Sequence, residues 1–245
     1  MIVIVIPCFN EAERLEPGPF VSFITAYQEV IFLFVDDGSA DATPFRLAEI
    51  KRQAGERVRL LSLENNMGKG EAVRRGILEG LRLQPSHIGY WDGDLATPLS
   101  ELPLFIAQSA EQNKKMIFGS RIQRLGADIT RHWYRHYPGR FIALWINVIL
   151  RLPVHDTQCG AKLIEAGLAA QICQEPFLSA WLFDVELFAR IIGLVGRDEA
   201  ARIIYEIPLQ RWEDVGRSKI ALSYLPQIPL ELGRIYLHYR TDLKG

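Results

Sequence analysis

Short apolar runs alternate with segments of helical periodicity along the first half of the chain. Five runs, most of them rich in Val and Ile and all bounded by turn residues, lie at 2–6, 30–35, 58–63, 88–91 and 116–119. Most of them are continuous rather than alternating, which is typical of strands covered on both faces. Helical spacing between them predicts helices at 43–54, 70–83 and 100–113. This order predicts an α/β fold with a doubly wound, mostly parallel sheet.

The second half of the chain reads as an elaboration of the same domain, because no linker divides it from the first half. An apolar helix is predicted at 139–151, further helices near 166–174 and 184–195, and a strand at 203–209. A Pro-interrupted apolar segment at 220–240 follows, and we expect it to dock on the core, with contact to a bilayer as the alternative. We therefore predict a single domain.

Two glycines lie four positions apart on the predicted helix 70–83. Gly76 and Gly80 share a face of that helix, which would let its backbone approach the sheet closely. The alternative is two glycines that the helix merely tolerates.

Composition and charge narrow the function classes. The chain has 245 residues, of which 49% are hydrophobic and 23% charged, and its formal net charge is −1. This is ordinary globular composition, and it lacks the cationic field of a nucleic-acid binder, so no nucleic-acid partner is expected. The cysteines, Cys8, Cys159 and Cys173, are odd in number and widely spaced. They predict neither a disulfide framework nor a zinc site, and they favour a reducing compartment.

The sequence gives no sign of a secretory leader or a membrane span. The N-terminal run lacks a basic flank and a small-residue cleavage site. The longest apolar stretch, at 141–150, is shorter than the ~18 residues that a span needs. We expect a cytoplasmic protein that is either free or peripheral on the cytoplasmic face of a membrane.

Polar clusters directly follow three of the predicted strands. They lie at 7–11, 36–41 and 92–94. Because the carboxyl ends of parallel strands share one edge of a sheet, we expect these clusters to converge on one crevice.

Asp92 and Asp94 are the strongest candidates for chemistry. Alternate residues at an extended strand end point the same way, so both carboxylates could bind one hard divalent cation that keeps positions open for phosphates. The alternative is a polar turn in which aspartates accept hydrogen bonds from nearby backbone N–H groups. We favour the metal, since Asp36 and Asp37 add further negative charge to the same crevice.

A glycine-rich loop precedes the predicted helix 70–83. Gly68, Lys69 and Gly70 stand where free N–H groups and the helix dipole favour an anion, although such loops are often only turns. The loop lacks the Walker A spacing. The G-x-G-x-x-G pattern of a dehydrogenase is also absent after the first strand.

Six motifs in order resemble family 2 glycosyltransferases of the GT-A, Rossmann-like fold. The motifs are VIPCFNEAERL (5–15), FVDDGSAD (34–41), NMGKGEAVRRG (66–76), WDGDLATP (91–98), GSR (119–121) and DTQCGAKL (156–163). Within that family they resemble the enzymes that transfer glucose or mannose to dolichyl or another polyprenyl phosphate. The resemblance covers about residues 2–165, with weaker matches at 183–187 and 216–219.

The resemblance implies roles for the residues in these motifs. It implies one glycosyltransferase domain over 1–245, with a nucleotide-sugar-binding half at 1–119 and an acceptor-binding half with a C-terminal helical segment at 120–245. Asp92 and Asp94 would hold Mg²⁺ or Mn²⁺, and Asp94 would also be catalytic. The residues implied to contact the nucleotide sugar are Pro7, Asn10, Glu11, Asp37, Gly38, Ser39, Gly68, Lys69, Gly70, Asp92 and Gly93.

Donor and acceptor follow from finer features of the resemblance. Mannosyl members carry a metal-binding Gln where this chain has Ala96, which favours UDP-glucose as the donor. Arg121 and Arg135, the latter in a basic and aromatic stretch, are implied to bind the acceptor phosphate. With them we group Ser218 and Lys219, which resemble a C-terminal loop that closes over donor phosphates.

Asp156 matches the aspartate that is often proposed as the catalytic base of the family. A phosphate monoester is already anionic near neutral pH, so Asp156 would either remove a proton or orient the acceptor or the cation. Capping of the turn before 160–164 is the structural alternative.

The sequence therefore predicts an inverting, metal-dependent glycosyltransferase that moves glucose from UDP-glucose to a polyprenyl phosphate at a membrane surface. The alternatives are GDP-mannose as donor, a soluble sugar acceptor, or a non-catalytic homologue that binds a sugar nucleotide. A homo-oligomer or a membrane-protein partner is left open.

Overall fold

A seven-stranded sheet forms the centre of the protein in the computed structural model, which describes residues 1–111, 114–130, 142, 144–214 and 227–243. The strand order is β3-β2-β1-β4-β7-β5-β8. Only β7 runs antiparallel to its neighbours, so the predicted α/β fold with a mostly parallel sheet is confirmed. The strands are β1 (Ile2–Cys8), β2 (Val30–Asp36), β3 (Val58–Ser62), β4 (His87–Trp91), β5 (Met116–Ser120), β7 (Ala161–Glu165) and β8 (Ile204–Pro208).

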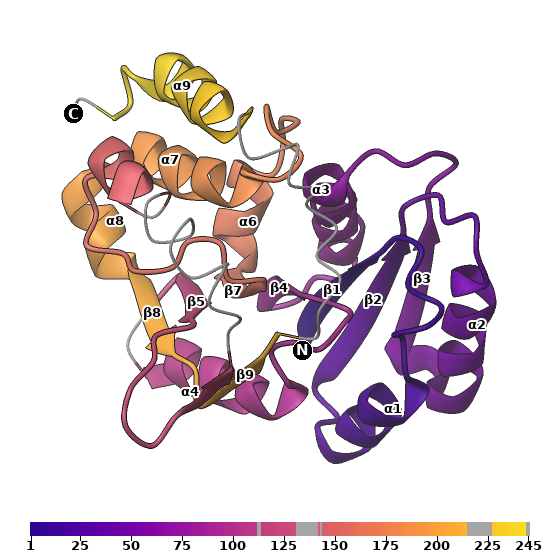
Figure 1. Cartoon of the computed structure of the whole chain (residues 1–245). Helices are drawn as coiled ribbons and strands as arrows, with labels where there is room; N and C mark the ends of the chain where they lie inside the picture. Colours follow the sequence, from indigo (N-terminus) through magenta and orange to yellow (C-terminus); the bar gives the residue numbers. More distant parts are fainter. Residues whose placement is uncertain (112–113, 131–141, 143, 215–226, 244–245) are drawn as a thin grey trace.

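Helices cover both faces of this sheet (Figure 1). One face packs on α1 (Pro17–Ala26), α2 (Thr43–Ala54) and α4 (Leu102–Glu111), which follows the 3-10 turn Leu99–Glu101. The other face packs on α3 (Lys69–Leu81), α6 (Ala166–Ile172), α7 (Phe183–Val195) and α8 (Arg197–Ile203). The last helix, α9 (Ile228–Tyr239), lies against the outer side of α7.

The continuous apolar runs make this three-layer arrangement. In β1, Ile4 and Ile6 point into the core beneath α1, whereas Val3 and Val5 point into the core beneath α3. All four side chains are fully buried. A strand buried on both faces needs apolar residues at every position, and this explains why its sequence does not alternate.

Gly76 and Gly80 bring α3 close to the sheet. A Cβ atom on Gly76 would lie 2.4 Å from Val5 Cγ1, and one on Gly80 would lie 2.6 Å from Ile88 Cδ1. Side chains at these positions would push the helix outward, so the close approach expected from the spacing is confirmed. This close packing fixes the distance between the sheet and the N-terminus of α3.

Several elements were not predicted from the sequence. These are α1, α8, the antiparallel strand β7, and a separate pair of short strands, β6 (Asp128–Thr130) and β9 (Arg211–Glu213). The expected docking of the C-terminal segment is confirmed for α9, which buries Leu232 and Ile235. Within the described parts of the chain, no helix is both long and apolar enough to cross a membrane.

Candidate functional site

The loops after β1 and β2 lock together at the carboxyl edge of the sheet. Asn10, in a left-handed conformation with φ 49°, donates its backbone N–H to Ser39 Oγ at 2.9 Å. Its side-chain oxygen accepts the N–H of Ala40 at 2.9 Å. Gly38 also has positive φ, and a Cβ there would lie 2.6 Å from the carbonyl carbon of Asn65. Only glycine fits this position.

Asp37 fixes the loop that leads into α3. Its two carboxylate oxygens accept the N–H groups of Met67 at 2.8 Å and Gly68 at 2.9 Å. Burial raises the pKa of Asp37 and the neighbouring Asp36 adds to this, although the two backbone donors act in the opposite direction. The structure thus shows Asp37 holding a loop, and its contact with a nucleotide stays a prediction.

Lys69 is the first residue of α3, and its side chain points to the end of β4. Its Nζ lies 2.5 Å from Oδ1 of Asp92. Burial alone would lower the pKa of Lys69, but Asp92, Asp184 and Asp94 together raise it above the ordinary value. Lys69 is therefore a firmly charged ammonium among three carboxylates.

The glycines on either side of Lys69 allow the chain to pack tightly. Gly68 has φ 89°, and a Cβ on it would lie 2.9 Å from Cβ of Ala180. Gly70 donates its N–H to the carbonyl of Ala180 at 3.0 Å. One N–H group at the start of α3 is thus already hydrogen-bonded within the protein. The positive charge that this loop can offer to an anion comes from Lys69.

Asp94 is the second carboxylate of the β4 turn. Its Oδ1 accepts the N–H of Ala96 at 3.1 Å, and its Oδ2 lies 3.8 Å from Nη1 of Arg14. Burial raises the pKa of Asp94, and the charge of Asp92 raises it further. The two carboxylates therefore repel each other, and a cation placed between them would lower the free energy of the charged pair.

The residues present fit a hard divalent cation. Asp92 and Asp94 supply oxygen ligands, and the positive charge now beside them comes from side chains that can move. Among the residues described, no group of three or more His, Cys, Asp or Glu side chains could hold a metal ion. A cation here would therefore take its remaining ligands from a bound phosphate and from water.

The turn before β7 supports Asp92 from the side. The backbone N–H of Asp92 donates to the carbonyl of Gly160 at 3.0 Å. A Cβ on Gly160 would lie only 1.9 Å from Asp92 Oδ2. The carboxylate thus occupies the space that the missing side chain leaves. Gly93, the residue between the two aspartates, would bring a Cβ within 3.2 Å of Ile6 Cγ2.

Arg121 and Asp156 form a bidentate ion pair. Arg121 Nε lies 2.6 Å from Asp156 Oδ2, Nη2 lies 2.7 Å from Oδ1, and the backbone N–H of Arg121 adds a third bond at 3.0 Å. Burial opposes the charged form of Arg121, yet Asp156 raises its pKa above the ordinary value. The guanidinium also lies over the ring of Trp212, 5.4 Å from its centroid.

These contacts bear on the role of Asp156, which the sequence leaves open between removing a proton and orienting the acceptor or the cation. A carboxylate that accepts three hydrogen bonds from an arginine is stabilised as the anion and is a weak proton acceptor. Glu206 fixes the backbone on the same side by accepting the N–H groups of His155 and Asp156, each at 3.0 Å. The geometry favours Asp156 as the residue that orients Arg121.

The structure brings most of the predicted residues to one edge of the sheet. Pro7 is the penultimate residue of β1, and Glu11 pairs with Arg14 at 2.6 Å, which in turn reaches Asp94. Arg135, Ser218 and Lys219 lie outside the described residues. The residues of this edge that sequence analysis missed are Arg14, Gly160, Lys162, Asp184 and Glu206.

Of the missed residues, Lys162 left the clearest signal. It stands within an apolar strand, and a lysine in such a place must find buried partners. The other four form contacts between distant segments, and their sequence neighbourhoods do not reveal these.

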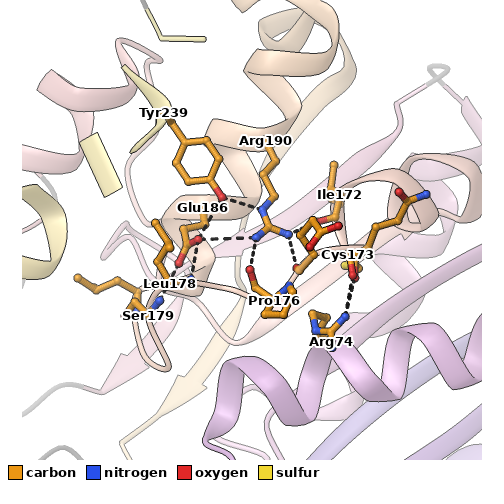
Figure 2. Close-up of polar contacts among 12 residues, drawn as sticks. Arg74, Ile172, Cys173, Pro176, Leu178, Ser179, Glu186, Arg190 and Tyr239 are labelled. Carbon is orange, nitrogen blue, oxygen red and sulfur yellow. Dashed lines mark hydrogen bonds and ion pairs between the residues drawn. The ribbon is translucent and has the colours of Figure 1, made fainter. Parts of the chain in front are cut away.

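A second buried network holds the segment 173–182, which packs against the start of α3 (Figure 2). Glu186, on α7, accepts the N–H groups of Leu178 at 3.0 Å and Ser179 at 2.9 Å. Arg190 donates to the carbonyls of Ile172, Glu175 and Pro176, each at 2.7 Å. These charges fix an irregular segment that borders Lys69.

Comparison with known proteins gives a consistent picture. The family model described as glycosyl transferase family 2 matches residues 3–171. A dolichyl-phosphate beta-glucosyltransferase of Trichomonas vaginalis is 30% identical over 257 residues, which cover 98% of this chain and 72% of the relative. The enzyme of the same description from Drosophila melanogaster is 30% identical over 262 residues, covering 96% of this chain and 74% of the relative.

Solved structures show the same fold. The glucosyl-3-phosphoglycerate synthase of Mycobacterium tuberculosis in complex with UDP superposes with a TM-score of 0.68 at 17% identity, covering 98% of this chain and 79% of that one. A complex of that enzyme with Mn²⁺, UDP and glucosyl-3-phosphoglycerate gives a TM-score of 0.66 at 18% identity, with the same coverage. At this identity the likeness concerns the fold, and it confirms the predicted GT-A architecture.

Proposed function

The chain belongs to glycosyl transferase family 2, and from this premise we propose that it transfers glucose from UDP-glucose to a polyprenyl phosphate with inversion at the anomeric carbon. The predicted family and the predicted enzyme class, a glycosyltransferase, are confirmed by the comparisons. The choice of lipid acceptor is supported by relatives described as dolichyl-phosphate beta-glucosyltransferases, which are 25–30% identical over most of the chain.

One observation carries the proposal: a pair of carboxylates and an arginine held by a third carboxylate are linked by a single turn. Asp92 and Asp94 end β4, and Asp92 is bonded to Gly160. Four residues before Gly160, Asp156 holds Arg121. Carboxylates that could bind a metal ion and a guanidinium that could bind a phosphate thus lie at one edge of the sheet. Transfer from a nucleotide to a phosphate requires both.

On the donor side, Lys69 and Arg14 supply positive charge beside the two aspartates. We propose that Asp92 and Asp94 hold Mg²⁺ or Mn²⁺, which would stabilise the negative charge of the departing UDP. Lys69 would then turn from Asp92 towards the diphosphate. The residues after β1 and β2, including Asn10, Gly38 and Ser39, would line the nucleotide.

On the acceptor side, Arg121 would bind the phosphate of the lipid, with Asp156 keeping its guanidinium in place. A phosphate oxygen forms the new bond to the anomeric carbon while the bond from that carbon to UDP breaks. A phosphate monoester is already anionic near neutral pH, so no proton has to be removed and no base is needed. We place Arg135, Ser218 and Lys219 near the phosphates on the resemblance alone.

The donor sugar is proposed from the turn after Asp94. Ala96 is buried, and its N–H and carbonyl are bonded to Asp94 and Glu213. It offers no side-chain oxygen to a cation, unlike the Gln of the mannosyl enzymes that the sequence resembles. This supports UDP-glucose over GDP-mannose. Because the acceptor is a lipid, we propose that the protein works at the cytoplasmic face of a membrane.

The test is transfer of radiolabelled sugar into an organic-extractable product. UDP-glucose, GDP-mannose and UDP-N-acetylglucosamine are each offered with a short polyprenyl phosphate, with Mg²⁺, with Mn²⁺ and with chelator. Asp94→Asn is compared with Asp198→Asn, which changes an exposed aspartate of α8. We expect metal-dependent labelling from UDP-glucose that is lost in Asp94→Asn and kept in Asp198→Asn.

Two results would contradict the proposal. Labelling from GDP-mannose alone would overturn the donor. Absence of lipid labelling, together with transfer from UDP-glucose to a soluble phosphorylated acceptor, would overturn the acceptor and leave the enzyme class intact.

A further inference from the structure

Three buried polar side chains meet directly beneath the candidate site. Lys162 of β7 is fully buried, and its Nζ lies 2.5 Å from Asp184 Oδ1. Tyr90, the cross-strand neighbour of Lys162 on β4, donates its hydroxyl to the same carboxylate. Asp184 is only 3% exposed, so the charge of Lys162 is balanced entirely inside the protein.

The remaining donors of Lys162 are directed at a turn of the main chain. Its ammonium donates to the carbonyl of Thr157 at 2.9 Å and to the carbonyl of Cys159 at 2.7 Å. With Asp184, these acceptors use all three N–H groups of the ammonium. The turn 157–160 is therefore folded around a buried cation.

Stability alone does not explain this arrangement. Replacing a buried ion pair with apolar residues of similar volume is often neutral or stabilising, because burying two charges costs solvation. What apolar residues would not provide is a donor for the two carbonyls of the turn. The function of the cluster therefore depends on which residues of the candidate site the turn holds in place.

The turn positions both halves of the site. At one end, Asp156 binds Arg121 through both carboxylate oxygens. At the other end, Gly160 accepts the N–H of Asp92 and leaves room for its carboxylate. A shift of the turn would move Asp92 and Asp156 relative to each other.

We infer that Lys162 is a positioning residue, whose ammonium, held by Asp184 and Tyr90, fixes the turn 157–160 and through it the separation of Asp92 and Asp156. The part of this inference that concerns catalysis rests on the proposed function. The part that concerns the turn does not. Lys162 acts through Asp92 and Asp156 and does not itself touch a substrate.

The test uses variants that separate positioning from burial of charge. Lys162→Met leaves the buried Asp184 without its ammonium partner and should lower stability strongly. The combined variant Tyr90→Phe, Lys162→Met, Asp184→Leu removes the whole cluster, so neither charge of the Lys162–Asp184 pair is left. We expect its unfolding free energy to recover towards that of the wild type, while the carbonyls of the turn still lack their donor.

Cys159 reports the position of the turn without any substrate. Its thiol is free and fully buried, and burial raises its pKa to about 12, so alkylation should be slow in the wild type. Cys8 and Cys173 are also buried cysteines and serve as internal controls. In the combined variant we expect Cys159 alone to be alkylated at least ~10 times faster, as measured by mass spectrometry.

Calorimetric titration with UDP in the presence of Mn²⁺ gives a second readout. We expect binding to the combined variant to weaken about 10-fold, the size of effect seen when residues behind metal ligands are removed. An unchanged labelling rate of Cys159, or equal acceleration at all three cysteines, would overturn the inference. If the wild type fails to bind UDP with Mn²⁺, the proposed function fails, and the rate at Cys159 still decides the inference.

Discussion

The ammonium of Lys69 lies 2.5 Å from Oδ1 of Asp92, on the carboxylate that we assign to a divalent cation. Neither side chain is fully buried, so the contact can open without exposing the core. Lys69 therefore balances Asp92 in the structure, and under the proposed function it would be released towards a diphosphate when a cation binds. One lysine would serve two states of the site.

Replacing Lys69 with Met should change metal and nucleotide binding in opposite directions. Mn²⁺ alone would no longer compete with an ammonium, so we expect its affinity to rise a few-fold. Binding of UDP with Mn²⁺ should weaken about 10-fold, because a cation for the diphosphate is lost. Calorimetric titrations measure both, and Lys51→Met on the last turn of α2 provides the control. If both affinities fell together, the idea that Lys69 moves from Asp92 to the diphosphate would be wrong.

Gly160→Ala should abolish transfer without unfolding the protein. The added Cβ would lie 1.9 Å from Asp92 Oδ2, so the carboxylate has to turn away from its present position. We expect kcat to fall at least ~100-fold and the Mn²⁺ concentration for half-maximal activity to rise. A misplaced ligand weakens both metal binding and catalysis. The measurement is a titration of activity with Mn²⁺.

Gly233→Ala is the matched control for this substitution. Gly233 lies inside α9, and nothing is within 4 Å of an added Cβ. Alanine should stabilise the helix by about 0.5–1 kcal/mol and leave activity unchanged. Equal activity of the two variants would show that Asp92 tolerates displacement.

The fold was largely predictable because strands buried on both faces appear in the sequence as short apolar runs. The first four strands and β5 coincide with apolar runs, most of them continuous, and α2 begins and ends where its helical spacing does. The strand β7 was missed because Lys162 interrupts its apolar character. Its insertion between β4 and β5 depends on partners far away in the chain, which no local pattern encodes.

Individual residues of the candidate site were predictable from the sequence, whereas the contacts between them were not. The spacing of Asp92 and Asp94 pointed to paired carboxylates, and the motif around Lys69 pointed to an anion site. The bond between Arg121 and Asp156 joins residues 35 positions apart. Each had been assigned a separate role, and only the structure shows that one side chain holds the other.

The network of Figure 2 should give stability a distinct dependence on pH. Glu186 is fully buried, and burial raises its pKa although Leu178, Ser179 and Arg190 act in the opposite direction. A carboxyl group with a higher pKa in the folded state favours folding while it is protonated. The wild type should therefore lose unfolding free energy as the pH rises from 4.5, the ordinary value, through the raised value.

Glu186→Gln has no such titration, so its stability deficit relative to the wild type should shrink as the pH rises. One group can change the difference by at most about 1.4 kcal/mol per pH unit. Urea unfolding between roughly pH 4.5 and pH 7 measures it, and Glu199→Gln, at an exposed position of α8, serves as the control variant. A deficit that grows with pH would mean that Arg190 outweighs burial.

Asp156→Asn distinguishes an orienting carboxylate from a catalytic base. If Asp156 only holds Arg121, the amide still accepts one hydrogen bond, and we expect kcat to fall ~10–100-fold with a higher KM for the lipid phosphate. The acid limb of the pH–rate profile should stay, because it would follow the second ionisation of the acceptor phosphate near pH ~6. Arg121→Lys should resemble Asp156→Asn, since lysine lacks the fork that matches a carboxylate. A larger loss in Asp156→Asn alone, with disappearance of the acid limb, would establish Asp156 as the base.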